Sequence, residues 1–178
     1  MALTLLLGGA RSGKTALAVD LARRAGLSVT VVATGEPRDE EMAARIARHR
    51  RDRPSSWSTV EEALDLAGAI RAAPADHALI IECLTLWTSN LLERGRTDDQ
   101  IVAEAGHAVA AVAGRATPTI AVSNEVGWGI VPMHPETRRF RDVLGLVNSA
   151  WSAAADPAML VVAGRVLPLS DPGGRIGG

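Results

Sequence analysis

Short apolar runs recur along the chain and alternate with longer stretches in which apolar residues return at helical spacing. Each run is rich in Leu, Ile, Val or Ala and is followed by polar or glycine residues. Apolar runs of this length are typical of strands that are buried on both faces of a sheet. We therefore predict strands over residues 3–7, 28–33, 78–82, 119–123 and 159–163.

The stretches between these runs predict helices over residues 14–25, 38–51, 60–73, 84–94, 98–114 and 135–155. Gly26 suits the end of the first helix, and Pro135 suits the first turn of the last. Strands that alternate with helices in this way are typical of βαβ units, which build a parallel sheet with helices on both faces. The sequence therefore predicts an α/β fold with a mostly parallel sheet.

No internal repeat or linker interrupts this alternation, so we expect a single domain over residues 1–169. The glycine-rich segment 170–178 offers little for a core, and we expect it to be a flexible tail.

Composition and charge narrow the class of protein. The chain is 47% hydrophobic and 22% charged, which is typical of a globular protein. Its net charge of −1 gives no field that attracts nucleic acid or a membrane surface, so we expect neither as a partner. No apolar run is long enough to span a membrane, and no signal-peptide pattern opens the chain. The single cysteine, Cys83, fits a reducing compartment, and we expect a cytoplasmic protein.

Residues 8–15 read GGARSGKT and match the phosphate-binding pattern G-x-x-x-x-G-K-[ST] between a predicted strand and a predicted helix. Backbone N–H groups and the helix N-terminus would surround a triphosphate. Lys14, the only lysine beside 18 arginines, would act catalytically on the β- and γ-phosphates, and the Thr15 hydroxyl would ligate Mg²⁺. The alternative, a chance match in a glycine-rich turn, is disfavoured by the flanking elements. The predicted nucleotide-binding residues here are Gly8, Gly9, Ala10, Arg11, Ser12, Gly13, Lys14 and Thr15.

A phosphate-binding loop of this kind needs an acidic residue for the metal ion at the end of a neighbouring strand. Glu82 ends the predicted strand 78–82 and is the candidate. The alternative is that Glu82 caps the helix that follows. We expect the metal-associated role, because an acid beside a phosphate site without a cation would be costly.

Arginines crowd the predicted helix 38–51, and one histidine lies among them. Arg45, His49 and Arg53 are spaced four residues apart and would share one face if the helix ran that far. A charge run of this kind is usually a solvated face with an incidental histidine. The functional alternative is an anion-binding surface on which nearby arginines keep the imidazole neutral and nucleophilic.

Longer segments of the chain resemble one known family. The matching segments are GGARSGKT, EEMAARIARHRRDRPSSWSTVEE, IIECLTLWTSNLL, VSNEVGWGIVP and FRDVLGLVNSAWSAAAD. Together they resemble the bifunctional adenosylcobinamide kinase / adenosylcobinamide-phosphate guanylyltransferase family of cobalamin biosynthesis, over nearly the whole chain up to about Pro168. The His-Arg-x-x-Arg-Pro-x-x-Trp-x-Thr-x-Glu and Asn-Glu-Val-Gly-x-Gly-Ile-Val-Pro runs are specific, whereas the phosphate-binding loop is shared by many families.

The resemblance implies two reactions on the aminopropanol arm of a corrinoid. The enzyme would phosphorylate adenosylcobinamide with ATP or GTP. It would then transfer GMP from GTP to adenosylcobinamide-phosphate, through a GMP–histidine intermediate, and release pyrophosphate. By position the guanylylated histidine is His49. The resemblance also implies a RecA-like fold and a homotrimer.

The same resemblance implies further site residues. Glu61 would contact guanine, although an exposed acid in the first turn of a helix is the alternative. Glu82 fits a position that either acid can take in this family. Residues at the end of the second strand and after His49 would contact the nucleotide and its phosphates: Ala33, Thr34, Gly35, Arg50, Arg51, Asp52 and Arg53.

The segment 122–132 follows a predicted strand, and its role stays open between two interpretations. It is either a loop near the substrate or a subunit contact, or a structural turn in which Trp128 packs.

Two other functions explain the sequence less well than this family does. A different small-molecule kinase with the same phosphate-binding loop would have no reason to carry the His49 motif. A GTPase switch would need an N-K-x-D signature, which the chain lacks because its only lysine is Lys14.

Overall fold

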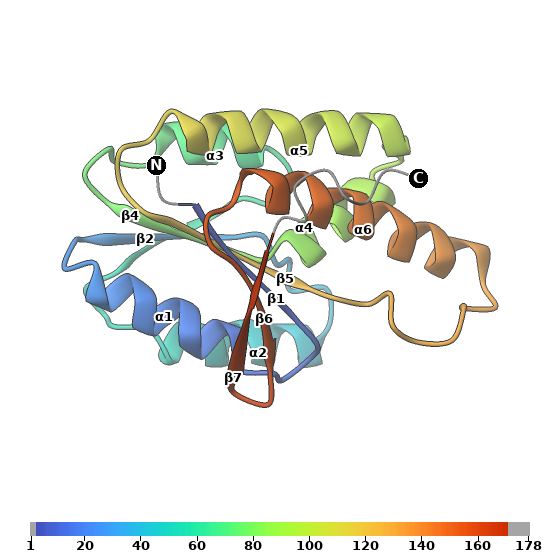
Figure 1. The fold of residues 1–178 in the computed structure, drawn as a ribbon, viewed down its shortest axis with the longest axis horizontal. Coiled ribbons are helices and arrows are strands. Elements are labelled where there is room, and N and C mark those ends of the chain that lie inside the picture. The colour runs from blue at the N-terminus through green and yellow to red at the C-terminus, as the bar shows by residue number, and fades with distance from the viewer. Residues whose placement is uncertain (1–2, 171–178) are drawn as a thin grey trace.

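A seven-stranded sheet forms the centre of the molecule in the computed structural model, which describes residues 3–170 (Figure 1). The strand order is β3-β2-β4-β5-β1-β6-β7, and every neighbouring pair is parallel except β6 and β7. The predicted mostly parallel sheet is therefore confirmed. The strands are β1 (Leu3–Gly8), β2 (Val29–Ala33), β3 (Ser58–Glu61), β4 (Ala78–Glu82), β5 (Thr119–Asn124), β6 (Ala158–Val162) and β7 (Arg165–Leu169).

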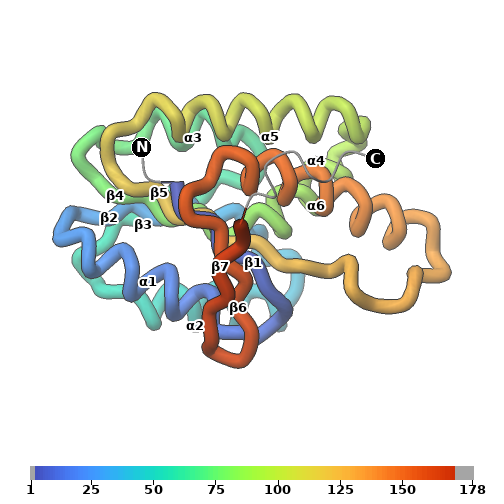
Figure 2. Tube along the Cα trace, viewed as in Figure 1, coloured from blue at the N-terminus to red at the C-terminus, as the bar shows by residue number. Residues whose placement is uncertain are grey.

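Helices cover both faces of this sheet, as predicted. Figures 1 and 2 show α1 and α2 on one face and the other four helices on the opposite face, where α5 and α6 run above the sheet. The helices are α1 (Lys14–Arg24), α2 (Glu40–Arg51), α3 (Leu66–Ala72), α4 (Leu84–Glu93), α5 (Asp98–Ala113) and α6 (Pro135–Ala154).

Each central strand contributes to two separate cores, because successive side chains point to opposite faces. In β1, Leu5 packs in the cluster that contains Trp87 and Trp151, while Leu6 packs in the cluster that contains Ala18 of α1. Burial on both faces explains why these strands appear in the sequence as apolar runs rather than as alternating patterns.

The predicted helix over residues 60–73 is wrong in its first part. Residues Ser58–Glu61 form β3, which pairs in parallel with β2, and Val60 lies opposite Val32. The helix α3 begins only after Asp65, whose side chain accepts a hydrogen bond from the Gly68 backbone N–H. This short edge strand reads Ser-Thr-Val-Glu and holds a single apolar residue, so its apolar signal was too weak to separate it from the helix.

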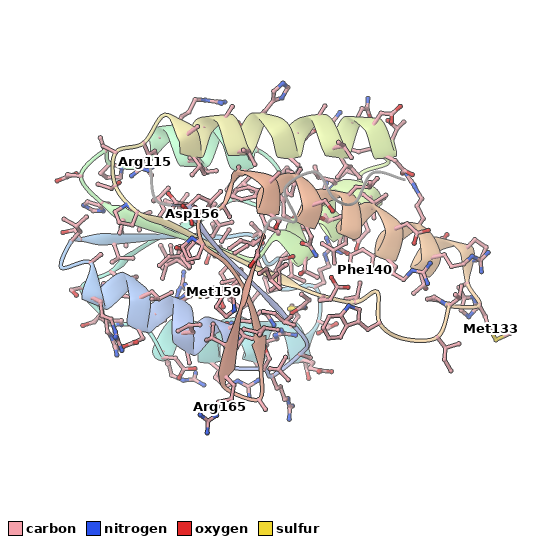
Figure 3. The ribbon with its side chains drawn as sticks, viewed as in Figure 1. Arg115, Met133, Phe140, Asp156, Met159 and Arg165 are labelled. Carbon is pink, nitrogen blue, oxygen red and sulfur yellow. The ribbon has the colours of Figure 1, made fainter. Side chains whose placement is uncertain are left out.

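The strand β7 was not predicted at all. It pairs with β6 through a tight turn at Ala163 and Gly164, whose φ angles are 49° and 73°. Pro168 lies within β7, and an edge strand tolerates proline because one side of it needs no ladder hydrogen bonds. Figure 3 shows Arg165 at the end of this hairpin.

Two expectations concern the limits of the chain. The single domain over residues 1–169 stays a prediction. The predicted tail 170–178 lies, apart from its first residue, outside the described residues. Within residues 3–170, no helix combines the length and apolar character that a membrane crossing requires.

Candidate nucleotide-binding and active site

Four neighbouring strands end at the same edge of the sheet and bring the predicted site residues together. Because these strands are parallel, the residues at their carboxyl ends gather at one edge, where ligands of such sheets bind. The terminal residues are Gly8 of β1, Ala33 of β2, Glu82 of β4 and Asn124 of β5. Register pairs Gly8 with Asn124 and Ala33 with Glu82.

The loop between β1 and α1 needs glycine at two positions. Gly8 has φ 152°, and a Cβ atom there would lie 2.2 Å from the backbone oxygen of Val161 in β6. Gly13, with φ 103°, is the N-cap residue of α1. The loop therefore follows a backbone path that other residues cannot adopt, and it leads directly into the positive N-terminal end of a helix.

Lys14 reaches back across this loop. Its Nζ atom donates hydrogen bonds to the backbone oxygens of Gly8 and Gly9, both at 2.7 Å, and to Oγ of Ser12 at 3.3 Å. The side chain is buried, and burial is the main cause that lowers the pKa of Lys14, with a further contribution from the charge of Arg45. The predicted lysine therefore lies inside the loop, where the phosphates of a nucleotide would be held.

Glu82 is the most connected acid of the site. Its Oε1 atom accepts a hydrogen bond from Thr15 Oγ1 at 2.7 Å, and its Oε2 atom accepts one from Arg53. Burial by itself would raise the pKa of Glu82, but hydrogen bonds from His49 and Thr15 and the charge of Arg53 lower it to about 2. The carboxyl group is therefore ionised at neutral pH and lies directly against the phosphate-binding loop.

The helix α2 carries His49 to the same edge of the sheet. α2 begins at the N-cap Asp39, whose side chain accepts a hydrogen bond from Met42 N, and it ends at Arg51. Nδ1 of His49 lies 3.1 Å from Oε1 of Glu82. The sequence led us to expect arginines near this histidine, and it did not predict the contact with a carboxylate. Arg53 contacts Glu82 from the segment after α2. The helical face expected to carry Arg45, His49 and Arg53 therefore includes only Arg45 and His49.

A cavity of about 740 Å³ lies between α2, the phosphate-binding loop and the strand ends. It is large enough for a nucleoside triphosphate. Most of the predicted site residues line it: Ala10, Arg11, Ser12, Gly13, Lys14, Thr15, Ala33, Gly35, His49, Arg50, Asp52, Arg53, Glu61 and Glu82.

Four predicted residues are not among those that line the cavity. Gly8 and Gly9 act through their backbone oxygens, which hold Lys14. Thr34 is fully buried and exchanges hydrogen bonds with the backbone of Cys83, so it joins β2 to the segment after β4. Arg51 is exposed at the end of α2.

The structure decides two alternatives that the sequence left open. Glu61 ends the strand β3 and accepts a hydrogen bond from Arg50 at 2.7 Å, so it is not a first-turn helix acid. Glu82 does not cap α4, because the N-cap residue of that helix is Cys83 and the carboxylate bonds elsewhere.

The segment after β5 is anchored beside the site and then leaves the body of the molecule. Glu125 N donates to Gly8 O at 3.2 Å, whereas Trp128 is 76% exposed and Ile130 is 97% exposed. Figure 3 shows Met133 at the far end of this loop, away from the sheet. The interpretation of Trp128 as a packing residue is therefore wrong within the described residues of this chain.

Arg45 and Asn124 also line the cavity, although the sequence placed Arg45 only on a possible anion-binding face and Asn124 only in a segment of open role. Arg45 precedes His49 by one turn of α2, and the four-residue spacing was the signal for it. Asn124 ends β5, and its backbone oxygen accepts a hydrogen bond from Asn148 at 3.1 Å. It belongs to the Asn-Glu-Val-Gly run, but only the pairing of β5 with β1 shows that it reaches the site.

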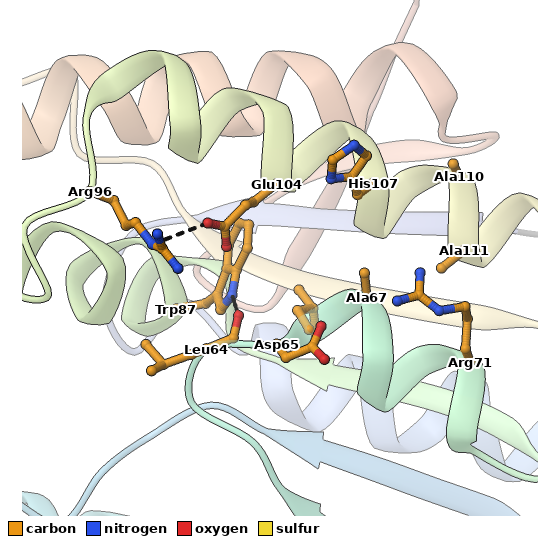
Figure 4. Close-up of a pocket in the computed structure, with 11 residues that line it drawn as sticks. Leu64, Asp65, Ala67, Arg71, Trp87, Arg96, Glu104, His107, Ala110 and Ala111 are labelled. Atoms are coloured by element: carbon orange, nitrogen blue, oxygen red, sulfur yellow. Dashed lines mark hydrogen bonds and ion pairs between the residues drawn. The ribbon is translucent and has the colours of Figure 1, made fainter.

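A second cavity, of about 590 Å³, lies between α3, α4 and α5 on the opposite face of the sheet (Figure 4). Two of its charged groups form an ion pair, and its tryptophan is hydrogen-bonded to the backbone. Arg96 pairs with Glu104 at 3.3 Å, and Trp87 Nε1 donates to Leu64 O at 2.8 Å. No glycine among the described residues lines this cavity. The helix α3 has only seven residues, which is too short for its N-terminus to hold a triphosphate.

Comparison with solved structures supports the fold. The RadB recombinase superposes with a TM-score of 0.53 at 15% sequence identity, over 89% of this chain and 73% of that protein. At this identity the likeness shows the fold alone, and it confirms the predicted RecA-like arrangement.

Comparison with known sequences extends over almost the whole chain. The bifunctional adenosylcobalamin biosynthesis protein CobP of Pseudomonas aeruginosa is 42% identical over 169 residues, which are 93% of this chain and 95% of that protein. The CobU proteins of Salmonella typhimurium and Escherichia coli are 40% and 38% identical, each over 90% of this chain and 95% of the relative. The model of the family described as cobinamide kinase / cobinamide phosphate guanyltransferase matches residues 4–169. The chain therefore belongs to the cobinamide kinase / cobinamide phosphate guanyltransferase family.

Proposed function

We propose that this chain performs both reactions at the cavity beside its phosphate-binding loop, and that the second passes through GMP bound covalently to His49. It phosphorylates adenosylcobinamide with a nucleoside triphosphate, ATP or GTP. It then transfers GMP from GTP to adenosylcobinamide-phosphate and releases pyrophosphate. The observation that carries this proposal is the 3.1 Å contact between His49 and Glu82, because Glu82 also bonds to Thr15 of the phosphate-binding loop.

In the kinase reaction, the loop residues bind and orient the triphosphate. The backbone N–H groups of the loop and the N-terminus of α1 surround the phosphates, and the ammonium group of Lys14 offsets the charge that develops on the β- and γ-phosphates. The acceptor hydroxyl attacks the γ-phosphorus, and the nucleoside diphosphate leaves.

Mg²⁺ fits this site by the chemistry of its donors. Thr15 Oγ1 and Glu82 Oε1 lie 2.7 Å apart, and hydroxyl and carboxylate oxygens are ligands that Mg²⁺ accepts. These two side chains, with phosphate oxygens, would hold the ion or its water ligands. When bound, Mg²⁺ supplies positive charge to the phosphates.

In the guanylyl transfer, His49 attacks the α-phosphorus of GTP. The arginines that share its cavity offset the charge of the departing pyrophosphate, and Arg45, Arg50 and Arg53 all line that cavity. Lys14 is a poor rival nucleophile, because a protonated amine bound to phosphates has no lone pair.

Glu61 is the proposed contact for the guanine base. A carboxylate can accept hydrogen bonds from the ring N–H and the amino group of guanine together, and adenine offers no such pair. Glu61 lines the cavity at the end of β3, and its present partner is Arg50 at 2.7 Å. The kinase reaction does not depend on this contact, so either ATP or GTP can serve it.

Four further points belong to the proposal. The family resemblance supports a homotrimer and the acceptors adenosylcobinamide and adenosylcobinamide-phosphate. The single cysteine supports a place in the cytoplasm, and the net charge of −1 supports the absence of a nucleic-acid partner.

The test is to locate the covalent nucleotide. The protein is incubated with GTP labelled at the α-phosphate and digested after glutamate at alkaline pH, because a phosphoramidate survives alkali and is lost in acid. Cleavage after Glu41 and Glu61 releases peptide 42–61, which contains His49, no other histidine and no lysine. We expect GMP on this peptide by mass spectrometry.

Two results would contradict the proposal. GMP on the peptide that contains Lys14 would make the intermediate a lysine adduct, and the full adduct in His49→Ala would exclude His49. A kinase that lacks guanylyltransferase activity would show no label at all. GTP labelled only at the γ-phosphate is the matched control, and it should leave no label on peptide 42–61.

A further inference from the structure

Glu82 lies where the phosphate-binding loop, α2 and the segment after α2 meet. Its Oε1 atom accepts from Thr15 Oγ1 at 2.7 Å and lies 3.1 Å from Nδ1 of His49, while its Oε2 atom accepts from Arg53. The side chains of Glu82 and Arg53 are each 9% exposed. The carboxylate is therefore held from several sides, and its orientation does not depend on His49.

This contact determines which ring nitrogen of His49 carries a proton. Both oxygens of the Glu82 carboxylate already accept hydrogen bonds, from Thr15 Oγ1 and from Arg53, and a carboxylate offers only acceptor atoms to a third neighbour. Nδ1 of His49 must therefore be the donor. A neutral imidazole with its proton on Nδ1 has its free lone pair on Nε2.

Little else orients this ring. α2 contributes no buried residue, so the helix is not locked by a packed apolar face. The side chain of His49 is 28% exposed, and between residues 3 and 170 its ring has no polar partner besides Glu82. Without the carboxylate, rotation of the ring would let either nitrogen face a nucleotide in the cavity.

We propose that Glu82 is a positioning residue for His49, which holds the Nδ1–H group and thereby presents Nε2 to the α-phosphate of GTP. This inference rests on the proposed function, because it concerns the GMP–His49 intermediate. It gives Glu82 a role in the guanylyl transfer that is separate from its proposed place beside Mg²⁺.

The chemistry balances with the proton kept on Nδ1 throughout. The lone pair of Nε2 forms a bond to the α-phosphorus, the bond from that phosphorus to the bridging oxygen breaks, and pyrophosphate leaves with the electron pair. The ring gains positive charge, which the carboxylate of Glu82 offsets. In the second half, a phosphate oxygen of the acceptor attacks the same phosphorus, and the electron pair of the N–P bond returns to Nε2.

The experiment asks which nitrogen carries GMP. Protein labelled with ¹⁵N-histidine is treated with GTP, denatured in alkali and examined by ¹H–¹⁵N NMR, in which Nδ1 and Nε2 adducts give different couplings. The wild-type protein should carry GMP on Nε2 only. In Glu82→Ala, the rate of adduct formation should fall on the order of 100-fold, and the remaining adduct should be distributed over both nitrogens.

Glu82→Gln provides an internal comparison, because its amide oxygen can still accept from Nδ1–H but carries no charge. Its adduct should stay on Nε2 and form about 10-fold more slowly than in wild type. Loss of the Mg²⁺ role alone would slow the reaction without moving the adduct, so the nitrogen that is modified separates the two roles. Glu104→Gln, which removes a carboxylate paired with Arg96 on the other face of the sheet, should match wild type.

Two outcomes would overturn the inference and leave the proposed function standing. One is a wild-type adduct on Nδ1. The other is a Glu82→Ala adduct confined to Nε2, which would show that the helix alone selects the nitrogen. Absence of any histidine adduct in the wild-type protein would contradict the proposed function itself. The wild-type measurement needs no variant, so an adduct on Nδ1 would overturn the inference even if Glu82→Ala does not fold.

Discussion

At the scale of single residues, the site is a small set of charged side chains that neutralise one another in a partly buried cavity. Glu82 is ionised because three neighbours stabilise its charge, and Lys14 is held by carbonyl oxygens of its own loop. Each of these charges is costly to bury without its partners. The roles of individual residues can therefore be separated by substitutions that remove one partner at a time.

Lys14→Ala should lower both the kinase and the guanylyltransferase rates by about 100-fold or more, because both reactions need a positive charge at the phosphates. The measurement is the initial rate of each reaction, with circular dichroism as the check of folding. A folded Lys14→Ala protein with wild-type rates would refute the assignment of the loop.

His49→Ala should separate the two activities. Transfer of the γ-phosphoryl group needs no covalent histidine, so phosphorylation of adenosylcobinamide should stay within about tenfold of wild type. Transfer of GMP should be abolished. The products of each reaction can be followed with GTP labelled at the γ- or the α-phosphate. If both rates fall equally in a folded protein, His49 is a shared binding residue.

Glu82→Gln should change how stability depends on pH. The pKa of Glu82 is lowered from 4.5 to about 2 in the folded protein, so its charge stabilises the fold above about pH 4.5. That contribution is lost as the pH falls from about 4.5 towards 2. The free energy of unfolding of wild type should therefore exceed that of Glu82→Gln by up to about 3 kcal/mol at pH 7, and the difference should shrink in acid. Denaturant titrations without nucleotide across this range test it, and a difference that stays constant would contradict it.

At the scale of elements, the structure separates the helices that build the core from the segments that serve the site. α6 buries Trp151 against the sheet, whereas α2 has no buried residue and the loop after β5 exposes Trp128 and Ile130. Segments with few buried contacts are the ones that can move at low cost. The histidine of the proposed intermediate thus lies on an element whose position depends on polar contacts at the site.

Two tryptophan substitutions should show this contrast. Trp151 is completely buried, so Trp151→Ala should lower the free energy of unfolding by about 3–5 kcal/mol. Trp128 is largely exposed, so Trp128→Ser should change it by less than about 0.5 kcal/mol. Denaturant unfolding of dilute protein measures both. A large loss in Trp128→Ser would mean that the loop packs against something in solution.

At the scale of the whole molecule, one parallel sheet places residues from distant parts of the sequence at a single edge. The phosphate-binding loop, α2 and the end of β4 are joined only there, through the contacts of Glu82. Large apolar side chains, such as Ile130 and Met133, remain exposed on the isolated chain. Exposed apolar residues that gather on one segment commonly mark an interaction surface.

The proposed trimer gives a direct prediction at this scale. Sedimentation equilibrium should yield a molar mass three times the 18.6 kDa of one chain. The mass should be the same with and without GTP if assembly does not depend on the nucleotide. A protein that sediments as a monomer at micromolar concentration would contradict the trimer, although it would leave the chemistry at His49 untouched.

The sequence by itself determined the features that depend on neighbouring residues. The loop 8–15 is a local pattern, the central strands are continuous apolar runs, and the His49 motif lies within one short segment. Each of these carries its signal in consecutive residues. The fold class and the family could therefore be predicted from the order of the amino acids alone.

Only the tertiary structure revealed the edge strands and the contacts between residues that are distant in the sequence. The edge strand β3 reads STVE and has a weak apolar signal, and the edge strand β7 contains Pro168, which only an edge position tolerates. The contact between His49 and Glu82 joins residues that no local pattern connects, and it adds a carboxylate to the arginines expected around this histidine. Such contacts form only when parallel pairing brings strand ends together, so the nitrogen that we propose to attack GTP depends on the sheet and not on the motif that contains His49.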